Sequence, residues 1–196
     1  MTENVTGADR ELHAALNLFW ASGAETTSYP EIVAATGLSR KALYARWPDK
    51  QALVEATLEG YRRTVLAGML ETLTREGPAA FWDRLEEATR VPGWNGCYLM
   101  RTGSGPLRTE PAVAAALAEY LDALHEAFRR RLREASLPVP PDLAAKQCVA
   151  LLALISQRGA AEGAGPAVAD LVSAGRRTCG MSQAAGTGGV ADRDAG

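Results

Sequence analysis

Apolar positions recur at helical spacing along most of the chain and predict an all-α protein. Asp49 is a natural N-cap, and apolar residues follow it at helical spacing from Leu53 to Leu73, which predicts one long helix that Gly77 and Pro78 end. Further helices are expected over residues 79–90, 97–101, 111–135, 141–162 and 166–178. No stretch alternates regularly between apolar and polar residues, so no strand is expected.

Two short helix signals stand near the N-terminus. Ser28 is followed three residues later by Glu31, the spacing of a capping box, and Pro30 fits the first turn of the helix that begins there. Gly37 ends this helix, and Ser39 is the N-cap of the next. Helix, short turn and helix is the layout of a helix-turn-helix, whose second helix enters the major groove of DNA.

The second of these helices is basic. Residues 38–50 carry four basic side chains against Asp49 alone, a net charge of +3 in a chain whose formal charge is −2. Leu43 and Trp47 share the opposite, apolar face. Basic residues on a solvated helix would give the same charge, but the caps, the glycine turn and the aromatic residues favour a DNA-binding face.

These residues resemble the DNA-binding domain of the TetR family of bacterial transcriptional regulators. The similarity runs from Leu12 to Gly23 and from Pro30 to Ala56, through the core TGLSRKALY and the sequence WPDKQAL that enters a long fourth helix. The resemblance implies a three-helix helix-turn-helix domain over residues 1–50 and a helical effector-binding and dimerisation domain over residues 51–179. It also implies a homodimeric repressor that binds a palindromic DNA operator until a small-molecule effector releases it.

The same resemblance implies which residues contact DNA. Phosphate contacts fall on Thr27, Ser39, Tyr44, Arg46 and Lys50. Contacts with base edges fall on Arg40, Lys41 and Ala45. Arg and Lys can donate to guanine O6 and N7, whereas hydroxyl groups suit phosphate oxygens. Ala45 is small where the family commonly has a longer polar side chain, which leaves the base specificity open.

Aromatic and sulfur-containing residues gather in the middle of the chain and are candidates to line an effector cavity. They are Met69, Trp82, Trp94, Cys97, Tyr98, Met100, Tyr120 and Phe128. Large apolar side chains at helical spacing more often form core. The glycine-rich segment 91–106 is where we expect the packing to be poorest, so a largely apolar or aromatic effector is expected there.

Cys97 allows an alternative function, a sensor of oxidants or electrophiles. A reactive thiol needs access and a lowered pKa, which Arg101 one turn later could provide. A buried, inert thiol is the favoured interpretation.

The last two predicted helices carry apolar faces rich in small residues, which permit close approach of helices. Their candidate contacts with a twofold mate are Leu151, Leu154, Ile155, Val168, Leu171 and Val172. In the TetR family the corresponding pair builds a four-helix interface, which the resemblance implies here.

Other classes of protein lack sequence support. The chain has two histidines and shows no metal-ligand cluster, nucleophile elbow or phosphate-binding glycine loop, so we expect no enzyme, cofactor or metal. A helical interaction module would not need the basic face from Arg40 to Lys50. Three cysteines without a CxxC pair, no apolar run near ~20 residues and no signal peptide predict a cytoplasmic protein without membrane contact. Residues 180–196 are small and glycine-rich and are expected to form a disordered tail.

Overall fold

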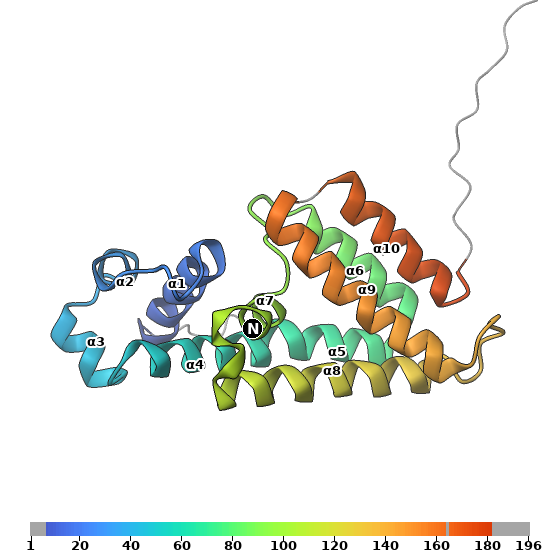
Figure 1. The fold of residues 1–196 in the computed structure, drawn as a ribbon, viewed down its shortest axis with the longest axis horizontal. Helices are drawn as coiled ribbons and strands as arrows, with labels where there is room; N and C mark the ends of the chain where they lie inside the picture. The colour runs from blue at the N-terminus through green and yellow to red at the C-terminus, as the bar shows by residue number, and fades with distance from the viewer. Residues whose placement is uncertain (1–6, 164, 182–196) are drawn as a thin grey trace, which may run out of the picture.

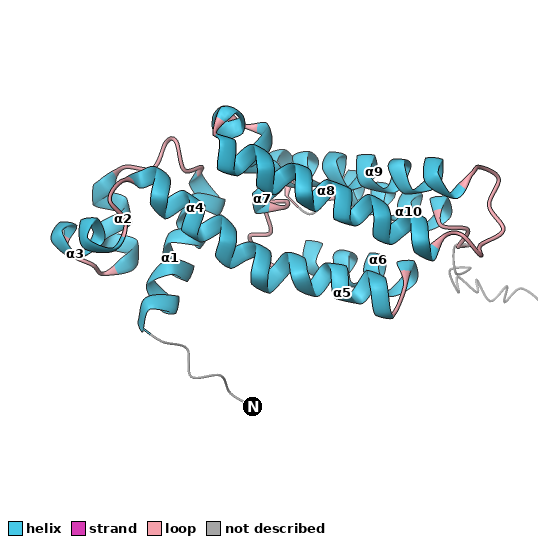
Figure 2. Ribbon diagram, turned by 90° about the horizontal axis from the view of Figure 1, so that it is seen from below, coloured by secondary structure: helices cyan, strands magenta, loops and turns pink. Residues whose placement is uncertain are grey.

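A computed structural model describes residues 7–163 and 165–181, and all regular secondary structure in these ranges is helical, as predicted. Three short helices, α1 (Gly7–Ser22), α2 (Tyr29–Thr36) and α3 (Arg40–Arg46), lie at one end of an elongated molecule (Figures 1 and 2). Phe19, Ile32 and Leu43 contribute one buried side chain from each helix to a common core. The helix-turn-helix is thus a packed unit that presents α3 at the tip of the molecule.

The predicted helix signals in this unit are confirmed. Glu31 accepts a hydrogen bond from the backbone N–H of Ser28 at 2.7 Å, and the Ser28 hydroxyl accepts from the backbone of Glu31. Gly37 adopts φ 71°, a left-handed conformation that costs glycine little, and its N–H bonds to the carbonyl of Val33. Ser39 accepts from the backbone of α3 at 3.2 Å. Local hydrogen bonds therefore set both ends of the turn.

The long helix after Asp49 has its predicted extent but is not uniform. It consists of α4 (Lys50–Tyr61), a π-helical turn η1 (Arg62–Leu66) and α5 (Ala67–Arg75). Asp49 caps its start by accepting from the backbone of Ala52 at 2.8 Å. The π-helical turn was not predicted. This run of helix leads from the helix-turn-helix unit along the rest of the molecule (Figure 1).

The remaining helices form the larger part of the fold. They are α6 (Pro78–Thr89), α7 (Tyr98–Ser104), a 3-10 turn η2 (Pro106–Thr109), α8 (Pro111–Arg131), α9 (Pro141–Glu162) and α10 (Pro166–Thr178). The α9 and α10 bounds match the prediction, whereas α8 ends four residues earlier than expected and η2 was not predicted. In the structure α8 lies along α5, and α9 packs against both α8 and α10 (Figures 1 and 2).

An aromatic cluster fills the centre of this larger part. Phe81, Trp82 and Phe128 are almost completely buried, and Phe81 meets both other rings edge to face, with centroids 5.6 and 5.1 Å away. Gly175 of α10 lets its backbone lie directly against the Trp82 ring. Among the described helices, none is long and apolar enough to cross a membrane. Residues 182–196 of the predicted tail lie outside the described residues.

Candidate functional site

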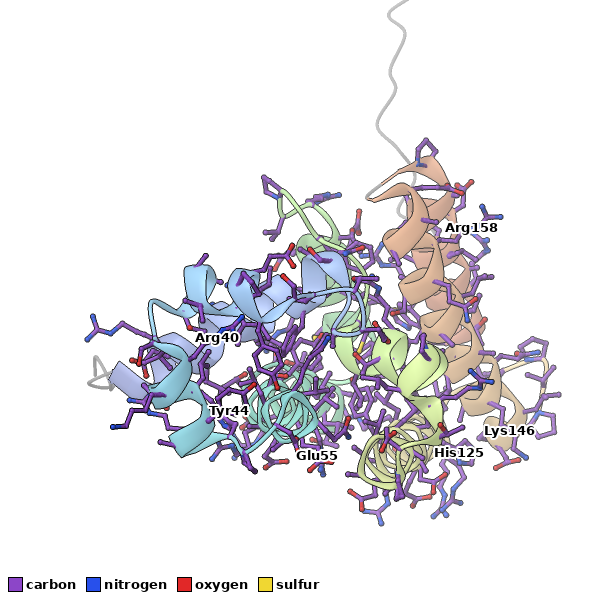
Figure 3. The ribbon with its side chains drawn as sticks, turned by 60° about the vertical axis from the view of Figure 1, so that its left-hand side comes forward. Arg40, Tyr44, Glu55, His125, Lys146 and Arg158 are labelled. Atoms are coloured by element: carbon purple, nitrogen blue, oxygen red, sulfur yellow. The ribbon has the colours of Figure 1, made fainter. Side chains whose placement is uncertain are left out.

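The exposed face of α3 is the candidate DNA-binding surface. Arg40, Lys41 and Tyr44 are exposed, with 48% of Tyr44 accessible, while Leu43 on the opposite face is buried. Tyr44 packs against the ring of Tyr29 of α2, with centroids 5.4 Å apart, which limits its motion. Figure 3 shows Arg40 and Tyr44 at the same end of the molecule. Among the described residues, neither Arg40 nor Lys41 has an ion-pair partner, so both cations are available to a ligand.

Two other residues that were predicted to contact DNA donate hydrogen bonds to backbone carbonyls within the protein. Lys50 donates to the backbone carbonyls of Glu25 and Thr27 at 3.1 and 2.7 Å. Thr27 is only 3% exposed, and its hydroxyl donates to the Gly23 carbonyl at 2.7 Å. In the described conformation this hydroxyl turns inward and fixes the loop before α2, so its contact with a phosphate stays a prediction.

The remaining predicted contacts stay on the surface. Arg46 is exposed and forms an ion pair with Glu11 of α1, so it also ties α3 to α1. Ser39 and Ala45 are exposed beside Arg40 and Lys41. The four basic residues of the motif thus divide into two without a partner, at the start of α3, and two that also hold the domain together.

A cavity of about 120 Å³ lies in the larger part of the fold. It is bounded by the long helix, α6, α8, α9 and the segment between α6 and α7. Five of the eight predicted effector-binding residues line it: Met69, Trp94, Cys97, Met100 and Tyr120. A second hollow, of about 240 Å³, is bordered by the exposed ion pair of Arg62 with Glu119 and is far more polar in character.

The other three predicted residues do not line the cavity. Trp82 and Phe128 belong to the buried aromatic cluster, and Tyr98 is buried between α7 and α4, where its hydroxyl hydrogen bonds to Thr57 at 2.9 Å. A contact of these three with an effector stays a prediction that this cavity does not support.

Sequence reasoning missed several lining residues. Tyr61, Val65 and Leu66 come from the same helix as Met69, and three of these four follow at a spacing of four. The helical periodicity could therefore have assigned them to one face. Trp20, which comes from α1, could not have been found in this way, because it reaches the cavity only through the tertiary fold.

The polar side-chain groups of the cavity are hydroxyl groups, one thiol and the Trp20 indole N–H. Among the described side chains that line it, none carries a charge. Burial raises the pKa of the Cys97 thiol and, more strongly, those of the Tyr61 and Tyr120 hydroxyl groups. Ser156 of α9 accepts a hydrogen bond from the Cys97 backbone N–H at 2.7 Å. The lining is thus neutral at physiological pH.

Arg101 does not activate Cys97. The guanidinium Nη1 donates to the carbonyls of Trp20 and Asn95, at 2.5 and 3.2 Å. The expectation that Arg101 lowers the pKa of Cys97 was wrong, since burial raises that pKa instead. The other two cysteines, Cys148 and Cys179, are free thiols with Sγ atoms 3.5 Å apart.

Three hydrogen bonds join the cavity wall to the helix-turn-helix unit; we call them the Trp20 latch. The Trp20 Nε1–H donates to the Gly96 carbonyl at 3.0 Å. The Trp20 carbonyl in turn accepts from Asn95 Nδ2 at 2.8 Å and from Arg101 Nη1. Trp20 and Gly96 also line the cavity, as does Trp94 in the same segment. One short segment therefore touches both the cavity and α1.

The predicted dimer contacts are divided between surface and core. Leu154 is 42% exposed, and Leu151 and Leu171 are partly exposed. Ile155, Val168 and Val172 are at most 2% exposed within the protomer. These last three fill the protomer's own core, and their contact with a partner stays a prediction.

Among the residues that the structure describes, no group of His, Cys, Asp and Glu side chains is arranged to hold a metal ion.

Comparisons with known proteins agree with the helix-turn-helix architecture. Residues 12–57 match the model of the bacterial regulatory proteins, tetR family. The HTH-type transcriptional repressor ComR of Escherichia coli strain K12 is 42% identical over 53 residues, which make up 27% of this chain and only 25% of the repressor. The regulatory protein TetR from Rhodobacter sphaeroides has a similar structure, with a TM-score of 0.73 and 22% identity, covering 89% of this chain and 97% of that one.

A structure of a SmeT–triclosan complex is also similar, with a TM-score of 0.65 and 17% identity over 89% of this chain and 88% of that one. At such identities the solved structures establish the fold, and the sequence match establishes the DNA-binding region. Together they support the same assignment. Residues 12–57 match the helix-turn-helix region of the bacterial regulatory proteins of the tetR family, and the described chain has the fold of solved TetR-family regulators.

Proposed function

We propose that the protein acts as a homodimer that represses transcription from an inverted-repeat operator until a small molecule in the 120 Å³ cavity releases it. The observation that carries the proposal is the Trp20 latch, which connects a ligand-sized cavity to the unit that presents free cations on α3. The repressor ComR and the triclosan complex of SmeT support repression and ligand binding, respectively.

The face of α3 suits DNA in two ways. Arg40 and Lys41 are exposed cations without a partner among the described residues, and such side chains can donate to guanine O6 and N7 in the major groove. Tyr44 and Ser39 present hydroxyl groups beside them, which suit phosphate oxygens. Base contacts therefore come from the start of α3, and the neighbouring groups fix its orientation.

A single α3 reads only a few base pairs, so specific binding calls for a dimer. A twofold dimer presents two recognition helices to two half-sites about one helical turn apart or somewhat more. We assign its interface to the partly exposed residues Leu151, Leu154 and Leu171 of α9 and α10. Their exposure in the protomer leaves apolar surface that a partner can bury.

The Trp20 latch offers a route from effector to DNA. A ligand that enlarges the cavity pushes on the wall that contains Trp94 and Gly96, and the Gly96 carbonyl is an acceptor of the latch. Breaking these hydrogen bonds frees α1 to shift relative to the cavity. Helices α2 and α3 shift with it, because α2 packs on α1 and α3 packs on α2. The same ligand thereby changes the spacing of the two α3 helices in the dimer.

The thiol-sensor alternative receives less support. Cys97 has a raised pKa and no cation beside its thiol, and both properties disfavour the thiolate that reacts with oxidants and electrophiles. If Cys97 were the sensor, Cys97→Ala would abolish induction by oxidants or electrophiles while leaving DNA binding intact. We expect this variant to respond as the wild type does.

The proposal is tested by the DNA affinity of matched arginine and lysine variants. Lys41→Ala should weaken operator binding by a factor that corresponds to ~1–3 kcal/mol, roughly 5- to 150-fold, and should relax the preference at one base position. The control is Arg63→Ala, because Arg63 is an exposed cation of η1 that forms its ion pair with Glu59, away from α3. Equal operator affinity of both variants would refute the assignment of α3.

A further inference from the structure

We infer that the effector is an uncharged compound of about the size of one aromatic ring, with one oxygen that accepts a hydrogen bond from the Tyr120 hydroxyl. This inference rests on the proposed function, since it describes the ligand of the same cavity. Its three parts, charge, polar contact and size, come from different observations.

Charge is excluded by the lining. No Asp, Glu, His, Lys or Arg is among the described side chains that border the cavity. Arg101, a nearby cation, is turned away and donates to backbone carbonyls. An ion transferred from water into this site would lose its hydration without gaining a counter-charge, a cost that hydrogen bonds to neutral groups do not offset. A carboxylate or an ammonium compound should therefore be rejected.

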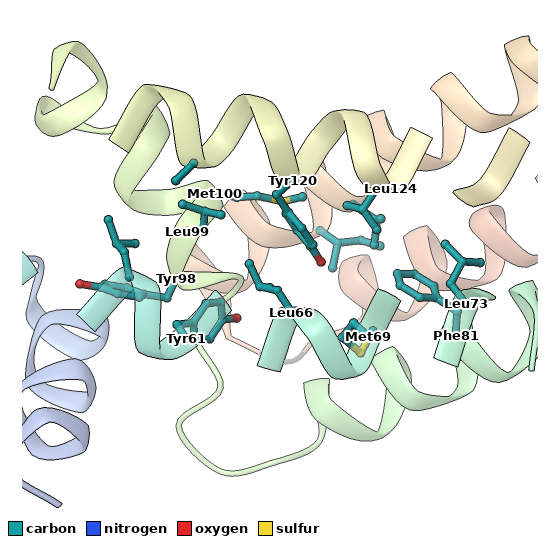
Figure 4. Close-up of a cluster of buried hydrophobic side chains, with 14 of the residues drawn as sticks. Tyr61, Leu66, Met69, Leu73, Phe81, Tyr98, Leu99, Met100, Tyr120 and Leu124 are labelled. Atoms are coloured by element: carbon teal, nitrogen blue, oxygen red, sulfur yellow. The ribbon is translucent and has the colours of Figure 1, made fainter. Parts of the chain in front are cut away.

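One hydroxyl group is left for a ligand. Tyr120 is only 8% exposed, it lines the cavity, and its hydroxyl has no hydrogen-bond partner among the described residues. Figure 4 shows Tyr120 reaching from α8 towards Leu66 and Met69 on the long helix. A ligand oxygen that replaces water at this point gains affinity through the hydrogen bond that it accepts from the Tyr120 hydroxyl.

The other polar groups of the lining are already engaged. The Tyr61 hydroxyl interacts with the Cys97 thiol, and Ser156 accepts from the Cys97 backbone. The Trp20 indole N–H is used in the latch. Among the described side chains of the lining, the Tyr120 hydroxyl is thus the group left for recognition of a ligand oxygen.

The size follows from the volume and the walls. A dry cavity of ~150 Å³ in another protein accommodates benzene, and the present cavity of about 120 Å³ is of similar size. Aromatic rings of Tyr61, Phe81 and Trp94 border it, and such walls favour a flat, aromatic ligand. Since Trp94 is only half-buried, a modest substituent can extend past it towards solvent.

Three probes of similar size test the inference with the full-length protein: acetophenone, which has an acceptor oxygen, ethylbenzene, which has none, and benzoate, which is charged. Calorimetry should show the tightest binding for acetophenone and at least tenfold weaker binding for benzoate. Tyr120→Phe should weaken acetophenone binding about tenfold, the equivalent of ~1.4 kcal/mol, and leave ethylbenzene unchanged. The control is Tyr98→Phe, because the Tyr98 hydroxyl bonds to Thr57 and does not border the cavity.

Several results would overturn the inference. They are no binding of any probe, binding of benzoate as tight as that of acetophenone, or an equal loss of acetophenone affinity in Tyr120→Phe and Tyr98→Phe. The calorimetric measurements involve no DNA, so a failure of the inference can be distinguished from a failure of the proposed function. Binding of acetophenone with the expected Tyr120→Phe effect, but without any change in operator affinity, would support the ligand class and refute effector release.

Discussion

The contacts of helical glycines with tryptophan rings give a prediction whose size follows from the structure. A methyl group on Gly175 would lie 2.3 Å from two atoms of the Trp82 ring, and one on Gly159 would lie 2.1 Å from the Trp94 ring. A methyl group on Gly60 of α4 would meet its nearest neighbour at 3.5 Å, an ordinary contact. Alanine has the same helix propensity at the three positions, but the room for its methyl group differs greatly between them.

The expected changes in stability of Gly175→Ala and Gly60→Ala have opposite signs. Replacing an interior helical glycine by alanine stabilises by up to ~1 kcal/mol, whereas overpacking a core costs ~1–3 kcal/mol. Trp82 is completely buried and its indole N–H is bonded to Cys179, so it cannot move aside. Gly175→Ala should thus lower stability by about 2 kcal/mol, or roughly 4–8 °C in Tm. Gly60→Ala should raise Tm by a few degrees.

Gly159→Ala should fall between these two variants, because Trp94 is half-buried in a loop and can swing away. Thermal unfolding followed by circular dichroism measures all three variants. The Trp94 displacement should also appear as a change in tryptophan fluorescence of Gly159→Ala that Gly60→Ala does not show. The described packing of α10 on α6 would be refuted if Gly175→Ala were as stable as Gly60→Ala.

Three further outcomes follow from the described contacts. Leu154→Asp should be a folded monomer by light scattering and should bind the operator much more weakly. Leu154 is exposed in the protomer, and a charge at this position would be buried in the dimer. A dimer with unchanged operator affinity would exclude Leu154 of α9 from the interface. Trp20→Phe should weaken operator binding two- to tenfold in fluorescence anisotropy, because it removes about one hydrogen bond of the latch, and unchanged affinity would argue against the latch. Ser28→Ala should lower Tm at neutral pH, because hydrogen bonds from Ser28 hold the pKa of Glu31 below its usual value. The stability that the Glu31 carboxylate adds is present above the usual pKa and is lost as the pH falls through the lowered pKa. The difference in Tm between wild type and Ser28→Ala should therefore narrow in acid.

Local signals in the sequence predicted most of the architecture. Ser28, Ser39 and Asp49 were assigned as N-caps from spacing alone, and each accepts the expected backbone hydrogen bond. The bounds of α9 and α10 were also predicted, because proline marks each start and a loop residue each end. Caps and prolines act through neighbouring residues, so they can be read without the fold.

The lining of the cavity could be predicted only in part, because it depends on which large side chains are enclosed by neighbours from other helices. Met69 and Trp82 are both large residues at helical spacing, yet the first borders the cavity and the second is enclosed by Phe81, Phe128 and Gly175. Nothing in the local sequence distinguishes the two situations. The Trp20 latch joins residues more than seventy positions apart, so it too requires the tertiary structure.

Selection of DNA sites from a random library by the purified wild-type protein tests the central claim most directly. The account predicts enrichment of an inverted repeat whose half-sites lie about one helical turn apart or somewhat more, bound by two protomers, and loss of this enrichment in Lys41→Ala. Recovery of no sequence above the non-specific background, or tight binding of a single half-site by a monomer, would contradict it.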